Sequence, residues 1–419
     1  MARKLGRGVA IVGAGMSRFG RFPDKGSREL VAEAFLDLKE SVDKGFDPED
    51  IEAIYVGNAS SDLFEKQGHM ASITADWLGL CPKPSTRTEG ACASGGLALK
   101  EGIIAVASGL HDLVLVVGVE KMTDLPTENV TEVLAAFSDG YYEVPAGFTF
   151  PGLYAAMATA YLNKYGAEEK HLRLVGLKNH ENGALNPKAQ FNMSIRDIMN
   201  QRIERARKRG EPIPEWKDEF DFLSDSNANP IIAWPLRLFD CSPITDGAAC
   251  LLLASQDIAK NFTDDPIYVV GFGQGSAPAL HNRDDITSIP SARFAAKMAY
   301  EMAGVEPRDI VIAEVHDCFT IAEIVATEDL GFFEQGEGYK AVEEGLTRRD
   351  GKKPVNTSGG LKSKGHPVGA SGVAQVVEIW EQMRGEAGER QVKRDIPLAL
   401  THNVGATGGT CVVHIFERR

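Results

Sequence analysis

Cys92 is the residue of this sequence whose type and position best suit covalent chemistry. It belongs to a run of small residues, 90–96, that precedes an apolar, alanine-rich segment from 97 to 106. That segment predicts a buried helix, and the free N–H groups and positive dipole at a helix start favour a thiolate. Cys92 is therefore a candidate nucleophile for a carbonyl carbon, although a cysteine with only a packing role fits the same pattern.

A histidine and a second cysteine, His316 and Cys318, follow an apolar strand-like segment from 309 to 315. Alternate residues of a strand point to the same face, so the two side chains are expected to project together. A pair of core residues explains this spacing equally well.

Another histidine, His366, lies in the glycine-rich stretch 356–372 and is followed by Pro367. Such a density of glycine favours close approach of the backbone to a ligand over simple packing. A last glycine turn, 402–409, lies between two apolar segments. Its N–H groups could stabilise an oxyanion, and a plain hairpin turn explains them almost as well.

One further glycine motif indicates structure more than chemistry. Residues 12–18 resemble the start of a dinucleotide fingerprint, but Arg18 stands at the third glycine position. The same strand-plus-glycine feature recurs at Gly271 and Gly273. This favours a structural turn over an NAD site.

Composition narrows the function classes. The 419 residues are 43% hydrophobic and 25% charged, with a net charge of −14. This is typical of a globular enzyme and argues against nucleic acid as a partner. The six cysteines are scattered without a C-x-x-C pair, so neither a disulfide framework nor a metal site is expected. No signal peptide or membrane-spanning segment is predicted, and the expected location is cytoplasmic.

The elements that would position these residues form two similar halves. In each half a strand with glycines, a helix, a second strand, a glycine turn and a buried helix follow in the same order. This predicts an internally duplicated α/β architecture with halves 1–265 and 266–419. The less regular segment 121–235 is expected to be a cap inserted over the site, and its charged run 204–209 predicts a solvated helix face.

Taken together, these stretches resemble the thiolase superfamily, in the branch similar to sterol-carrier-protein-type and archaeal-type acetoacetyl-CoA thiolases. The resemblance rests on the Cys92 turn, residues 316–319, residues 365–367, residues 242–249 and the terminal glycine turn, in family order. It implies a thiolase fold, a five-layered αβαβα arrangement of two halves with an inserted loop domain. The implied activity is thiolysis of a β-ketoacyl-CoA, or the reverse Claisen condensation.

The resemblance also implies roles for the four reactive side chains. Cys92 would be the nucleophile that becomes acylated, and His366 would activate its thiol and line one oxyanion hole. His316 would help to hold the thioester oxygen there. Cys318 would be the second acid/base, exchanging a proton with the α-carbon.

Further positions follow from the same resemblance. The backbone N–H groups of Cys92 and Gly405 would form the other oxyanion hole, and Ser242 would touch the pantetheine arm of CoA. Asn403 stands where many thiolases carry the acid/base cysteine. In this branch, the resemblance implies that Cys318 has the acid/base role instead. Coenzyme A would be a co-substrate, with no permanently bound cofactor and no metal.

The resemblance implies a homodimer or homotetramer and a possible complex with a small OB-fold, zinc-ribbon protein. No membrane partner is expected. The acyl group stays open between acetoacetyl, a longer chain and a bulkier aromatic or dicarboxylic group. The rival hypotheses are a related condensing synthase, a non-catalytic subunit and an NAD oxidoreductase. The second reactive cysteine, Cys318, argues against a synthase.

Overall fold

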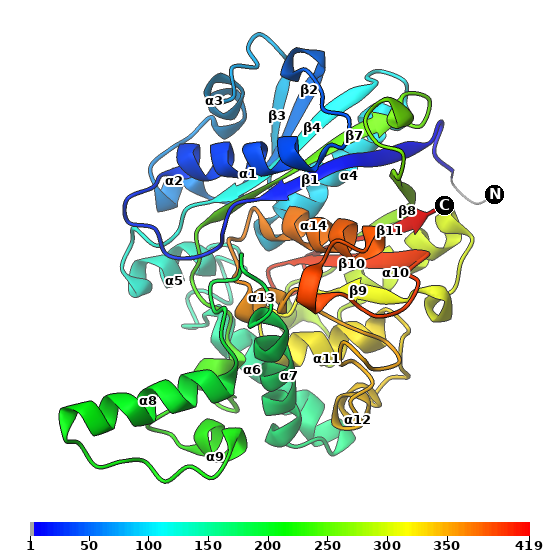
Figure 1. Cartoon of the computed structure of the whole chain (residues 1–419). Coiled ribbons are helices and arrows are strands. Elements are labelled where there is room, and N and C mark those ends of the chain that lie inside the picture. Colours follow the sequence, from blue (N-terminus) through cyan, green and yellow to red (C-terminus); the bar gives the residue numbers. More distant parts are fainter. Residues whose placement is uncertain (1–3) are drawn as a thin grey trace.

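The computed structural model describes residues 4–419, and its centre is a mixed nine-stranded sheet with the order β3-β2-β4-β7-β1-β8-β11-β10-β9 (Figure 1). The strands of the first half are β1 (Val9–Met16), β2 (Ala53–Gly57), β3 (Ser85–Thr88), β4 (Leu113–Glu120) and β7 (Gly247–Ser255). Those of the second half are β8 (Ile267–Ser276), β9 (Ile312–Glu314), β10 (Leu398–Gly405) and β11 (Thr410–Arg418).

The strand order confirms the predicted duplication. Outward from the centre, the first half runs β1-β7-β4-β2-β3 and the second runs β8-β11-β10-β9. Each half thus places its first, last, next-to-last and second strands in the same order outward from the centre. Strands β1 and β8 pair antiparallel where the halves meet. In the place of β3, the second half has a single parallel bridge between Ala313 and Val355.

Helices complete the five layers that the sequence predicts. Helices α1 (Ser27–Ser41) and α3 (Met70–Trp77) cover the outer face of the first half, and α10 (Pro290–Ala303) packs on β8 and β11. Between the halves lie α4 (Ser94–Ala107) and α14 (Ser371–Arg384), which share one buried apolar cluster with strands of both halves. The remaining helices of the second half are α11 (Thr320–Asp329), α12 (Gly338–Glu343) and α13 (Gly360–Ser363).

The glycines of the dinucleotide-like motif pack against helices. A Cβ on Gly15 would fall 2.1 Å from the backbone nitrogen of Leu38 in α1. In the second half, a Cβ on Gly273 would fall 2.0 Å from the carbonyl oxygen of Ala295 in α10. The same helix–strand contact in both halves supports a structural role for these glycines.

The segment between β4 and β7 holds most of the remaining elements. They are α5 (Thr127–Ala135), α6 (Phe150–Tyr165), α7 (Glu169–Gly183), α8 (Ile195–Arg209), α9 (Glu219–Ser224), β5 (Ile231–Ala233) and β6 (Leu236–Arg237). The short helix α2 (Ser61–Phe64) lies in the first half. Helices α8 and α9 form an arm that projects from the body (Figure 1).

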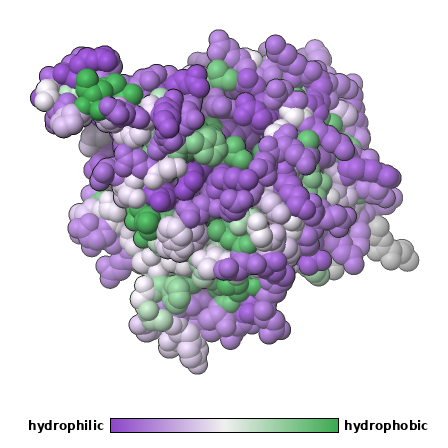
Figure 2. All heavy atoms as spheres, turned by 90° about the horizontal axis from the view of Figure 1, so that it is seen from below, coloured by the Kyte–Doolittle hydropathy of each residue, from purple (hydrophilic) through white to green (hydrophobic). Residues whose placement is uncertain are grey.

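The arm has a small core of its own, which includes Met199, Phe222 and Leu223. Its outer surface is mostly hydrophilic, with one small hydrophobic patch (Figure 2). The last turn of α8 exposes Arg207, Lys208 and Arg209, as the prediction of a solvated helix face requires. No helix within residues 4–419 has the length and apolar character needed to cross a membrane.

Candidate active site

Cys92 lies in a short 3-10 turn, Ala91–Ala93, immediately before α4. Ser94 holds this turn, because its hydroxyl donates to the carbonyl of Ala91 at 2.6 Å and accepts from the amide of Gly90 at 3.0 Å. The Cys92 side chain is buried, and only 7% of the residue is exposed. The candidate nucleophile is therefore carried on a hydrogen-bonded turn at the start of α4.

Burial raises the pKa of the Cys92 thiol to about 12, and the carboxylates of Glu120 and Glu89 act in the same direction. The N–H groups of Ala406 and of Cys92 itself lower the pKa, but they do not outweigh desolvation. Burial therefore acts against the thiolate that the helix start favours. A Cys92 thiol with a raised pKa needs a base to activate it.

His366 has the geometry of that base. Its Nδ1 lies 2.7 Å from the hydroxyl of Ser371, and this hydroxyl donates to the carbonyl of Pro367 at 2.9 Å. Since the serine proton is committed to Pro367, Nδ1 donates and Nε2 keeps its lone pair. Burial lowers the pKa of His366 to about 3, so the ring is neutral. Among residues 4–419, Nε2 has no hydrogen-bond partner.

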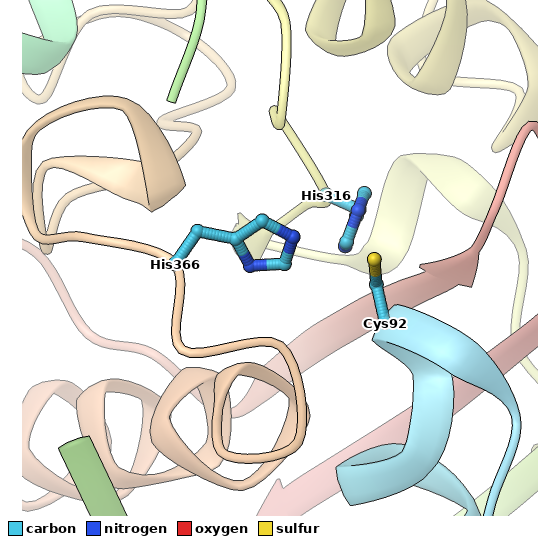
Figure 3. A group of neighbouring side chains, drawn as sticks. All are labelled: Cys92, His316 and His366. Carbon is cyan, nitrogen blue, oxygen red and sulfur yellow. The ribbon is translucent and has the colours of Figure 1, made fainter. Parts of the chain in front are cut away.

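His316 reaches the same place from the loop after β9. The strand ends at Glu314, so the expectation that His316 and Cys318 share a strand face is wrong, although the loop still brings both residues to the site. Reactive atoms of Cys92, His316 and His366 lie within 4.8 Å of one another. The two rings are 5.0 Å apart at 81°, and both point toward the sulfur (Figure 3).

Cys318 precedes α11 and lines the same cavity as Cys92. Burial raises the pKa of its thiol well above the usual value, and the nearby Cys92 adds to this effect. The nearby hydroxyl of Tyr154 lowers the pKa but does not outweigh burial. The ring of Tyr154 also stacks on Phe319 at 4.6 Å. The second thiol thus shares its site with the nucleophile and a phenol.

The cavity has a volume of about 460 Å³. Reactive or polar residues on its wall include Cys92, Cys318, His366, Ser242, Tyr154, Arg21 and Gln190. Apolar residues on its wall are Met122, Leu134, Phe150, Ile244, Phe319 and Val368. The sequence-predicted Cys92, Cys318, His366 and Ser242 therefore meet around one space with an apolar lining that suits an acyl chain.

Two predicted residues do not line this cavity. His316 is 1% exposed, and its ring lies 5.0 Å from that of His366, which does line the cavity. Gly405 ends β10, where a Cβ would fall 2.2 Å from the carbonyl oxygen of Gly90, so glycine is needed for contact with the Cys92 turn. Its neighbour Ala406, with φ 54°, is the residue on the cavity wall.

The glycines around His366 face protein atoms. A Cβ on Gly369 would fall 2.6 Å from the carbonyl oxygen of Val119, and one on Gly372 would fall 2.2 Å from Oδ1 of Asn403. Gly365, with φ 115°, packs against Thr245. The expectation that these glycines serve a ligand is corrected: they let the His366 loop press against other parts of the protein.

Sequence reasoning missed one buried anchor of this loop. The carboxyl group of Glu120 accepts hydrogen bonds from the amides of Ala59, Ser60 and Gly369 at 2.8, 3.0 and 3.1 Å. It also accepts one from the side chain of Asn58 at 3.1 Å. Glu120 thereby ties the His366 loop to the first half. In the sequence, the one indication of this role is that Glu120 is an acidic residue at the end of an otherwise apolar strand.

Family models match almost the whole chain. Residues 9–257 match "Thiolase, N-terminal domain", and residues 274–418 match "Thiolase C-terminal domain-like". The chain belongs to the thiolase family. The resemblance inferred from the motifs is thereby confirmed.

Individual thiolase relatives extend this result. The chain is 48% identical to an acetyl-CoA acetyltransferase of Methanothermobacter thermautotrophicus, over 98% of this chain and 100% of that protein. It is 34% identical to the benzoylsuccinyl-CoA thiolase subunit BbsB of Thauera aromatica, over 97% of this chain and 96% of that protein. Among solved structures, the Ltp2–ChsH2(DUF35) aldolase aligns with a TM-score of 0.78 and 23% identity over 98% of both chains. That likeness shows the fold.

Proposed function

We propose that this protein is a thiolase that cleaves a β-ketoacyl-CoA with coenzyme A, or runs the reverse Claisen condensation, through an acyl group on Cys92. The observation that carries the proposal is the meeting of Cys92, His366 and Cys318 around one cavity. Carbon–carbon cleavage of this kind needs a nucleophile, a base for it and a second acid for the departing carbon.

In the first step, Nε2 of His366 takes the proton of Cys92. The thiolate then attacks the 3-keto carbon of the substrate. The resulting alkoxide is proposed to accept hydrogen bonds from the amide of Cys92 and from the amide of Gly405 or of its neighbour Ala406, which is the residue on the cavity wall and whose amide lies beside the sulfur. Removing one such donor typically slows an enzyme by about 10²–10³-fold.

In the second step, the alkoxide collapses and the bond between C2 and C3 breaks. Its electrons form an enolate whose thioester oxygen is held by His316 and His366, and Cys318 gives its proton to the α-carbon. A proton passes from His366 to the Cys318 thiolate and resets both groups. The thiol of a second CoA then loses its proton to His366 and attacks the acyl group. Cys92 leaves and recovers a proton from His366.

Acetoacetyl-CoA is the substrate that we propose first, because the archaeal relative is an acetyl-CoA acetyltransferase. A bulkier aromatic or dicarboxylic acyl group is the second candidate, and the similarity to a benzoylsuccinyl-CoA thiolase subunit favours it. Ser242, on the cavity wall, is proposed to contact the pantetheine arm in either case.

Other features of the proposal concern assembly. We infer a cytoplasmic homodimer or homotetramer built from units 1–265 and 266–419, with 121–235 as the loop domain. A small OB-fold, zinc-ribbon protein is proposed as a further partner, and the structural likeness to the Ltp2–ChsH2(DUF35) aldolase favours such an assembly. Mass measurement of the native protein, alone and with such a partner, tests both inferences.

A substrate panel tests the reaction. The purified protein is incubated with CoA and acetoacetyl-CoA, a longer-chain or an aromatic β-ketoacyl-CoA, and product thioesters are separated by chromatography. We expect CoA-dependent cleavage of at least one of them. Condensation without any CoA-dependent cleavage would favour a synthase, and turnover that needs a nicotinamide would favour an oxidoreductase.

A further inference from the structure

Asn403 contacts two of the three catalytic elements without reaching the cavity. It lies in β10, is 1% exposed, and is surrounded by the Cys92 turn, the His316 loop and the starts of α4 and α14. Asn403 takes no direct part in the proton transfers or bond changes proposed for the reaction. Its contacts nevertheless decide which nitrogen of His316 carries a proton.

The orientation of the Asn403 amide is fixed from two sides. Its Oδ1 accepts from the amide of Gly96 at 3.1 Å, and its Nδ2 donates to the carbonyl of Cys92 at 2.9 Å. Exchanging oxygen and nitrogen would set two donors against each other at Gly96 and two acceptors at Cys92. The amide group therefore has one allowed direction.

That direction leaves the second Nδ2 hydrogen facing Nδ1 of His316 at 3.3 Å. An amide NH₂ group can only donate, so Nδ1 must accept. Burial lowers the pKa of His316 well below its usual value, which keeps the ring neutral. A neutral imidazole with an accepting Nδ1 carries its proton on Nε2.

The two active-site histidines thus differ in their tautomers. In His366, the Ser371 contact leaves Nε2 as an acceptor. In His316, the Asn403 contact makes Nε2 a donor, and this atom has no partner within residues 4–419. Cys92, His316 and His366 are all residue types that can bind a metal ion. A protonated Nε2 has no lone pair to offer, so His316 is a poor metal ligand through this atom.

We propose that Asn403 is a positioning residue that fixes His316 with its proton on Nε2, so that this ring donates a hydrogen bond to the thioester oxygen as the enolate forms. The tautomer itself follows from the contacts alone. The catalytic use of the donor rests on the proposed function.

The tautomer is tested directly by ¹⁵N spectroscopy of the histidine rings, with His316 assigned from its loss in His316→Gln. We expect a protonated Nε2 and an unprotonated Nδ1 in the wild-type protein. A proton on Nδ1 would overturn the proposal. This readout needs no substrate, so it decides the point even if no β-ketoacyl-CoA is cleaved and the proposed function fails.

The catalytic consequence is tested with Asn403→Asp in two backgrounds. A carboxylate beside Nδ1 draws the proton there, so Nε2 loses its donor and kcat for cleavage falls about 10²–10³-fold. In His316→Gln, the glutamine amide supplies a donor that does not depend on a tautomer. Asn403→Asp should then lower kcat by a clearly smaller factor, because the lost donor to the carbonyl of Cys92 still counts but the tautomer of residue 316 no longer does, following the logic of a double-mutant cycle.

The control is Asn229→Asp. Asn229 is 1% exposed, accepts from the amide of Phe239, donates to the carbonyl of Leu223, and is not among the residues that line the cavity. It should leave kcat unchanged. An equal loss of kcat from Asn403→Asp in both His316 backgrounds would show a general structural role and contradict the proposal.

Discussion

The hydroxyl of Tyr154 donates a 2.9 Å hydrogen bond to the carbonyl of Ala406. This bond joins helix α6 of the inserted segment to the turn after β10, whose N–H group faces the nucleophilic sulfur. The inserted segment therefore takes part in shaping the site that it covers.

Replacing Tyr154 by phenylalanine should remove this link. The partly buried carbonyl of Ala406 loses its protein partner, and losing a hydrogen bond of this kind typically costs about 0.5–1.5 kcal/mol of stability. We expect a lower free energy of unfolding in denaturant titrations and a reduced kcat. Tyr142→Phe is the control, because Tyr142 is 69% exposed and should change neither value. Equal stability of the Tyr154→Phe and wild-type proteins would show that the bond contributes nothing.

The crossing of the two central helices depends on Gly95. A Cβ at this position would fall 2.8 Å from the carbonyl oxygen of Gly369. Gly95→Ala should therefore push the Cys92 turn away from the His366 loop, and such overpacking costs about 1–3 kcal/mol. Gly140→Ala, where a Cβ meets nothing within 4 Å, is the matched control. Denaturant titration compares them, and identical midpoints would contradict the close packing.

The resting protonation states predict how Cys92 reacts with an alkylating agent. With its pKa raised to about 12 and that of His366 lowered to about 3, the pair is a neutral thiol and a neutral imidazole between these values. Below the thiol pKa, the thiolate fraction rises about tenfold per pH unit. The rate of iodoacetamide modification should therefore climb steadily from pH 6 to 9.

Peptide mapping by mass spectrometry follows modification at Cys92, with Cys92→Ala marking the background. A rate that is flat across this range would show a resting thiolate–imidazolium pair instead.

The second thiol has a separable role. Cys318→Ala should still accept an acyl group on Cys92, because His366 and the amide donors are unchanged. It should fail to exchange the α-protons of acetyl-CoA with deuterated water, since no acid/base faces that carbon. Exchange at the wild-type rate, measured by NMR, would remove Cys318 from the mechanism.

The order of elements and several of the side chains that meet at the cavity could be predicted from the sequence, because both depend on local patterns. Apolar strands such as β4 and the small residues around Cys92 carry their signal within a few positions. His316 and Cys318 are predicted to lie together because they would share one face of a strand. They do both lie at the site, but a loop brings them there, since β9 ends two residues before His316.

Other properties of the site depend on contacts between distant residues. The pKa of the Cys92 thiol is raised mainly by burial, and the residues next to Cys92 in the sequence do not show how deeply it is buried. Asn403 contacts Cys92 across 311 positions, and Glu120 contacts Gly369 across 249. The glycines around His366 likewise have partners that appear only once both halves are folded together.

The central claim is that the acyl group passes through the sulfur of Cys92. The most direct measurement is rapid acid quenching after mixing with acetoacetyl-CoA, followed by peptide mapping in the mass spectrometer. We predict an acetyl group on the peptide that contains Cys92, and its disappearance when free CoA is added before the quench. Cleavage of acetoacetyl-CoA by a protein whose Cys92 stays unmodified, or undiminished cleavage by Cys92→Ala, would contradict the account.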